Sequence, residues 1–66
     1  MILVNNREKI EYLDGITVQD ILSALGWDYA LIMVKVDGVF IPKEDYSSTA
    51  VPDEADVKAI HIAHGG

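Results

Sequence analysis

The residues that bear most directly on chemistry are the last two, Gly65 and Gly66, which follow a strand-like run at 56–64. A chain that leaves a strand and ends in paired glycines presents its terminal carboxylate on a stem without side chains. Glycine lacks a Cβ, so such a stem can adopt any dihedral angles that a narrow enzyme channel requires. Glycine pairs also occur by chance, and their meaning therefore depends on what the preceding residues build.

Other groups that could do chemistry are two histidines and several carboxylates. His61 and His64 are three residues apart, and on a strand this spacing points them to opposite faces. No cysteine or third ligand is set at zinc-binding spacing, so we predict no metal site. The acidic side chains are predicted to form a solvated surface, with no paired carboxylates for acid–base catalysis: Asp20, Asp28, Glu44 and Asp45.

Composition limits the possible partners. The chain has 66 residues, a hydrophobic share of 50% and no cysteine, which predicts one domain that folds on packing alone. Its net charge of -6 argues against a nucleic-acid partner, because binding to phosphates requires clustered Lys and Arg, which this sequence lacks. No apolar run is long enough to cross a bilayer, and the first residues lack a basic segment followed by a hydrophobic one. We expect a cytoplasmic protein, monomeric when free.

The first half of the chain predicts a hairpin and a helix. Strands are expected at 1–5 and 8–13, joined by a turn at Asn5 to Arg7, since Asn tolerates the left-handed conformation. Thr17 and Asp20 resemble a helix cap, and apolar residues at 18, 21, 22 and 25 follow helical spacing up to Gly26.

The second half predicts three more strands. Residues 31–36 and 39–41 flank Asp37 and Gly38, a strong hairpin signal. Pro42 ends the second of these strands, and 43–46 is expected to form one helical turn. A charged turn at 53–56 precedes the last strand at 57–63.

This order of elements predicts an α+β fold, the ubiquitin-like β-grasp roll, in which one helix packs across a mixed sheet. The right-handed crossover rule predicts that the third strand lies beside the first and parallel to it, if both lie in one sheet. The final strand is expected next to the first, in the sheet interior. Residues 64–66 are expected to form a flexible tail.

A docking surface is predicted from the last strand. Its alternation is ambiguous, because Val57, Ala59 and His61 share one parity while Ile60 and Ile62 share the other. Either the strand has a bulge, or Ile60 and Ile62 lie on a face that the helix does not cover. In the second case they would join Phe40 in an exposed apolar patch, which we predict to be a docking surface for partner proteins.

Two aromatic residues, Trp27 and Tyr29, are expected at the corner between the helix and the third strand. They could anchor a partner, since aromatic residues dominate interfaces. We favour the alternative, in which they close the small core.

Taken in order, these features resemble the sulfur-carrier family that includes the thiamin-pathway carrier (ThiS) and the small subunit of molybdopterin synthase (MoaD). The resemblance covers essentially the whole chain and is nearest to the thiamin branch. Members often have Asp-Gly-Asp at the acidic turn and a small residue in place of His64. The matching features are Asn5, the helix entry 14–18 with Ile21 and Leu22, the strand end at Ile41 and Pro42, the turn 43–46, the acidic turn 53–56, and Gly65 with Gly66.

The resemblance implies that the chain is a protein cosubstrate and not an enzyme. A partner adenylyltransferase of the ThiF or MoeB type would activate the Gly66 carboxylate with ATP, and a sulfur donor would convert it to a thiocarboxylate. Gly65 and His64 would complete the tail that enters the partner, and the chain itself would hold no cofactor. The sulfur would pass to a thiazole synthase of the ThiG type; the alternatives are molybdopterin synthesis, tRNA thiolation, or conjugation to other proteins through Gly66.

Overall fold

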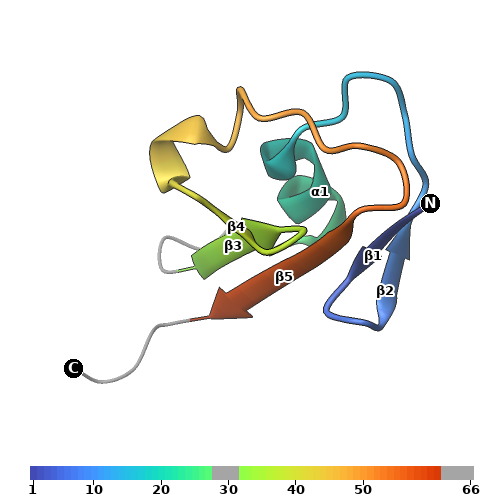
Figure 1. Ribbon diagram of the computed structural model, residues 1–66, viewed down its shortest axis with the longest axis horizontal. Helices are drawn as coiled ribbons and strands as arrows, with labels where there is room; N and C mark the ends of the chain where they lie inside the picture. The colour runs from blue at the N-terminus through green and yellow to red at the C-terminus, as the bar shows by residue number, and fades with distance from the viewer. Residues whose placement is uncertain (28–31, 62–66) are drawn as a thin grey trace.

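The computed structural model describes residues 1–27 and 32–61, and these residues form a mixed sheet with one α-helix on it (Figure 1). The elements are β1 (Ile2–Val4), β2 (Glu8–Ile10), α1 (Val18–Leu25), β3 (Ile32–Val36), β4 (Val39–Ile41), a 3-10 turn (Lys43–Asp45) and β5 (Asp56–His61). The predicted fold class is confirmed. Strand β2 is shorter than predicted, because Ile10 pairs with Ile2 at the start of β1 and later residues find no further partner there.

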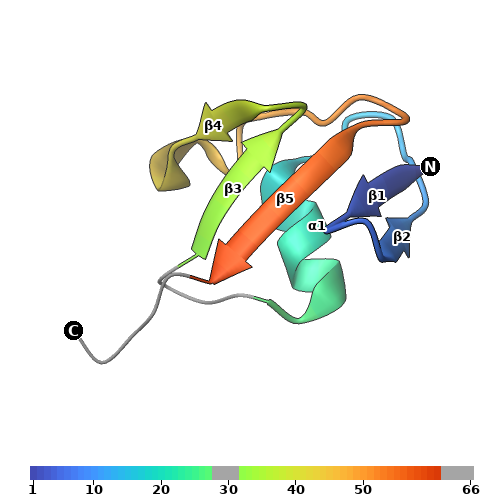
Figure 2. The same cartoon turned by 60° about the horizontal axis from the view of Figure 1, so that its bottom comes forward.

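Strand β5 occupies the centre of the sheet, whose strand order is β2-β1-β5-β3-β4 (Figure 2). It runs parallel to β1 and antiparallel to β3, which confirms the prediction that the final strand lies beside the first. The prediction that the third strand lies beside the first, parallel to it, is wrong. The helical crossover instead connects β2 to β3, which are parallel to each other, and β1 and β5 fill the space between them.

Helix α1 lies across one face of the sheet, as Figure 2 shows. The predicted cap is a full capping box: Thr17 Oγ1 accepts from the Asp20 N–H, and the Asp20 carboxylate accepts from the Thr17 N–H. Gly26 ends the helix in the left-handed conformation, at φ 72°. No helix among the described residues is long and apolar enough to cross a membrane.

The core lies between α1 and the sheet, and Tyr46 closes it beside the 3-10 turn. The Tyr46 hydroxyl is buried and donates a hydrogen bond of 2.7 Å to the Ile32 carbonyl. Burial raises the pKa of this hydroxyl. The core consists of Ile2, Val4, Ile16, Val18, Ile21, Leu22, Ile32, Val34, Val36, Ile41, Tyr46, Val51, Ala55, Val57 and Ala59.

The acidic turn before β5 is present as predicted, with Glu54 at φ 65°. Asp56 opens the strand by donating its N–H to the Asp37 carboxylate at 2.8 Å. The carboxylates of Asp53 and Glu54 accept hydrogen bonds from the Met1 ammonium, which raises the pKa of the ammonium and lowers that of Asp53. These contacts connect the start of β5 to the start of β1.

Asn5 holds the second half of β5. Its backbone leaves β1 in the left-handed conformation, at φ 56°, after donating its N–H to the Val57 carbonyl at 2.8 Å. Its side-chain amide then donates to the Ala59 carbonyl at 3.0 Å and accepts from the Ala59 N–H at 2.8 Å. The amide therefore continues the hydrogen-bond ladder beyond the point where β1 turns away.

Replacing Tyr46 by Phe should lower the free energy of unfolding by about 1–2 kcal/mol, because the Ile32 carbonyl loses its buried donor. The hydroxyl also makes stability depend on pH. Its pKa is raised in the folded state, so its contribution is complete below about pH 10, the ordinary pKa of tyrosine, and is lost as pH rises through the folded-state value.

Urea unfolding between pH 7 and 11 measures both effects. Wild-type protein should lose stability above pH 10 more steeply than Tyr46→Phe does. Tyr12→Phe removes a hydroxyl from a half-buried tyrosine and serves as the control. Equal pH slopes for wild type and Tyr46→Phe would contradict this account.

Replacing Asn5 by Gly should cost about 1–3 kcal/mol, since two hydrogen bonds are lost while the left-handed backbone is still tolerated. Amide hydrogen exchange at Ala59 should become faster, because its N–H loses its acceptor. Asn6→Gly is the matched control, since Asn6 also has positive φ, at 57°, in the same turn. Equal destabilisation by the two changes would mean that the Asn5 amide does not hold β5.

Candidate functional site

The described part of the chain ends at His61, the last residue of β5. The residues predicted to carry the chemistry, Gly66, Gly65 and His64, lie outside the described residues, and so does Ile62 of the predicted patch. The structure does describe β5, the strand that precedes these residues in the chain. The candidate site is therefore built from β5 and the sheet surface around it.

Strand β5 is held on both sides along most of its length. Its pairing with β3 runs without interruption from Ile32 opposite His61 to Val36 opposite Val57. On its other side β5 pairs with β1 as far as Val57, and the side-chain amide of Asn5 then bonds the backbone of Ala59. A strand paired on both edges cannot shift its register without breaking both ladders. The described end of the chain therefore leaves the sheet from a fixed position.

The register settles which residues of β5 face outward. Val57 and Ala59 are buried against the core, while Lys58 and Ile60 point to the opposite side, which we call the open face. The uninterrupted pairing with β3 excludes a bulge between Val57 and His61. Of the two alternatives left by the sequence, the uncovered position of Ile60 is confirmed.

The open face carries apolar and basic side chains in rows across the strands. One row joins Ile60 to Met33, and the next joins Lys58, Lys35 and Phe40. Strand positions on this face are Leu3, Lys9, Met33, Lys35, Phe40, Asp56, Lys58 and Ile60.

The apolar patch on this face consists of Met33, Phe40 and Ile60. Phe40 is 54% exposed and Ile60 is 45% exposed, and Met33 is half-buried between them. Met33 pairs directly with Ile60 and lies diagonally from Phe40, within reach of long side chains. The sequence prediction missed Met33, although the alternation of buried Ile32, Val34 and Val36 would have placed it outward.

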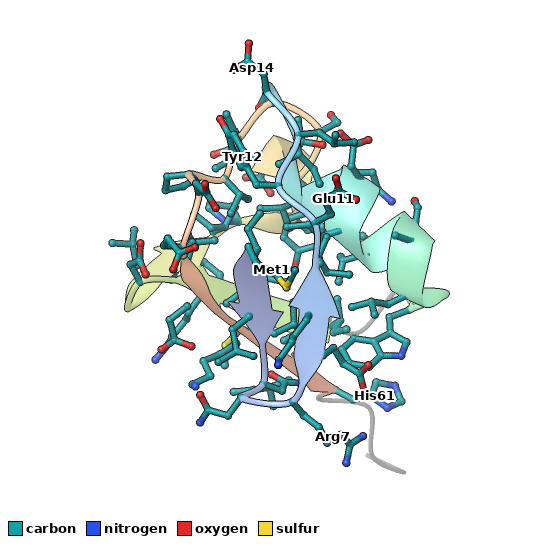
Figure 3. The ribbon with its side chains drawn as sticks, turned by 90° about the vertical axis from the view of Figure 1, so that its right-hand side faces the viewer. Met1, Arg7, Glu11, Tyr12, Asp14 and His61 are labelled. Carbon is teal, nitrogen blue, oxygen red and sulfur yellow. The ribbon has the colours of Figure 1, made fainter. Side chains whose placement is uncertain are left out.

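A shallow hollow of about 220 Å³ lies where β5 ends. Its lining includes Arg7, Trp27 and His61, and Figure 3 shows Arg7 and His61 at the same end of the molecule. Trp27 is half-buried and packs on the core, which confirms the predicted structural role for it. Tyr29 lies outside the described residues. Arg7 was not singled out from the sequence, because its place beside β5 depends on long-range pairing.

The remaining polar groups do not form a catalytic arrangement in the described part of the chain. Asp20 caps α1, and Glu44 and Asp45 are exposed on the 3-10 turn. Asp28 lies outside the described residues. Among residues 1–27 and 32–61, no group of three or more His, Asp or Glu side chains is arranged to hold a metal ion.

Comparison with solved structures gives a full-length match. The chain is similar to a thiamine biosynthesis protein (ThiS) from Geobacter metallireducens, whose crystal structure superposes with a TM-score of 0.78 at 25% sequence identity. The match covers 98% of this chain and 97% of that one. The solution structure of a thiamine biosynthesis protein from the same organism gives a TM-score of 0.74 at 25% identity, covering 98% of this chain and 86% of that one.

Comparison of sequences gives two results. Among curated proteins no sequence match was found. The model of the ThiS family matches residues 2–66, which is almost the whole chain and includes the terminal glycines. Together with the observed ubiquitin-like sheet order, this match shows that the chain belongs to the ThiS family of small sulfur carriers.

Proposed function

We propose that this chain carries sulfur for thiamin biosynthesis on the terminal carboxylate of Gly66. The observation that supports this most directly is the family match over residues 2–66. The names of the matched Geobacter structures, which are thiamine biosynthesis proteins, favour this pathway over the other branches of the carrier family.

The proposed chemistry has two steps, both carried out by a partner adenylyltransferase of the ThiF type. In the first, a carboxylate oxygen of Gly66 attacks the α-phosphorus of ATP and pyrophosphate leaves. In the second, sulfur at the oxidation level of sulfide attacks the acyl carbon and AMP leaves with its electron pair. The product is a thiocarboxylate, whose sulfur then passes to a thiazole synthase of the ThiG type.

This chain contributes position and access to that scheme, and not acid–base chemistry. Central strand β5 is fixed by β1, β3 and the Asn5 amide, so the residues after His61 start from a defined place on the surface. Gly65 and Gly66 bear no side chains, which allows close approach of partner backbone to the reacting carboxylate. The chain contains no cysteine that could compete as a sulfur carrier.

Docking is assigned to the apolar patch of Met33, Phe40 and Ile60, with Ile62 as a further predicted member. Ile60 of the patch lies on β5, the strand that precedes the tail, so a partner covering the patch is also close to the residues that follow His61. Exposed aromatic and apolar side chains at the centre of an interface contribute most of its binding energy.

Deleting Gly66 should abolish modification while leaving the fold intact. The protein is incubated with the adenylyltransferase of its own organism, ATP and a sulfur donor, and intact mass is measured. Wild-type protein should gain the mass of an oxygen-to-sulfur exchange at its C-terminus, and the deletion variant should not. Thermal unfolding provides the control, because both proteins should melt at the same temperature. An unchanged wild-type mass would contradict the proposed function.

Replacing Phe40 by Ala should raise the KM for carrier in adenylation about tenfold, the equivalent of about 1.4 kcal/mol of lost binding. Val39→Ala is the matched control, because Val39 is 62% exposed on the same strand but has the opposite parity. Both changes should leave the melting temperature within a few degrees of wild type, since both side chains are exposed. If Val39→Ala raises KM as much as Phe40→Ala, the open face is not the docking surface.

A further inference from the structure

Basic residues are concentrated on the open face of an otherwise acidic molecule. The chain has 5 basic and 11 acidic residues, and three of the basic ones, Lys9, Lys35 and Lys58, lie on this face. Of the two carboxylates on the described strands, Asp56 lies on the open face and Glu8 on the other side. Among the strand positions of the open face, three lysines therefore stand against one carboxylate, in a molecule whose net charge is -6.

The arrangement of these lysines is unfavourable for the fold itself. Lys35 and Lys58 are directly opposite each other on β3 and β5. Like charges in this position are destabilising, because their Cβ atoms are only about 4.5–5.5 Å apart. Asp56 pairs with Lys58 at 3.1 Å, and Lys35 is exposed with no ion pair to another described residue. Stability of the fold therefore does not explain a lysine at position 35, whereas binding to another molecule would.

The charges point to a protein partner. A nucleic acid would be repelled by the net charge, and three lysines are too few to outweigh it by neutralising phosphates. Lys35 and Lys58 instead lie beside the exposed apolar patch, with Lys35 between Phe40 and Lys58 in one row. A polar rim around an apolar centre is the usual anatomy of a protein–protein interface.

We propose that the open face recognises a partner surface in which carboxylates surround an apolar centre, and that Lys35 provides the main charge contact. This inference rests on the proposed function, whose activating adenylyltransferase is the partner to which it applies. The acidic remainder of the carrier is repelled by such a surface and the lysine-bearing face is attracted to it. The approaching carrier is thereby oriented with the patch, and β5 with it, toward the partner.

Charge reversal at Lys35 tests the proposal. With Lys35→Glu, the association rate measured with the adenylyltransferase of the same organism should fall about tenfold at 20 mM NaCl. The difference from wild type should shrink as NaCl is raised to 0.5 M, because salt screens exposed charges. The melting temperature should stay equal or rise, since the change removes repulsion from Lys58. A lower rate in a protein of undiminished stability cannot result from misfolding.

The matched control is Lys43→Glu, which makes the same change in net charge on the 3-10 turn, away from the open face. Its association rate should stay within twofold of wild type. Equal effects of the two reversals, or no effect of either, overturn the charge proposal while sulfur transfer to wild type still supports the proposed function. Absence of any modification of wild-type protein overturns the proposed function, and the charge proposal with it.

Discussion

The structure depends on the central position of β5. This strand is the last one in sequence, yet it pairs with β1 on one side and β3 on the other. Parallel pairing with β1 extends only to Val57, which lies opposite Val4, the last residue of β1. The Asn5 amide extends it by bonding both the N–H and the carbonyl of Ala59, the two backbone groups that a longer β1 would have paired. The Asn5 side chain thus replaces the backbone that β1 lacks beside the second half of β5.

Because one helix covers only one face of the sheet, the two sides of β5 have different roles. Side chains on the covered side stabilise the fold, and side chains on the open face are available for recognition. Val57 and Ala59 are buried beneath α1, where a change of volume would alter the core. Lys58 and Ile60 lie on the opposite side of the same strand, away from α1, where they can contact a partner. Within the described residues, 1–27 and 32–61, no second layer covers that side, so the open face is available for binding.

Local patterns were sufficient to predict the elements but not their arrangement. The capping box at Thr17, the turn at Asp37 and the 3-10 turn each depend on residues close in sequence, and all three were predicted. The predicted strand order was partly wrong, because it took the first strand as the start of the helical crossover. The crossover starts from β2, which directly precedes the helix. The Asn5 contacts span 54 residues, a separation at which no local pattern carries information.

The candidate site was also predicted only in part. An exposed patch with Phe40 and Ile60 was predicted only as one of two alternatives, because apolar residues on both faces of the last strand left its parity ambiguous. Only the register with β3 resolves that ambiguity, and the same register brings Met33 into the patch and sets Lys35 opposite Lys58. Folding alone would favour an opposite charge at one of these two positions. A sheet face that combines exposed apolar side chains with an unfavourable charge pair is better explained by the needs of binding than by those of stability, as functional surfaces commonly are.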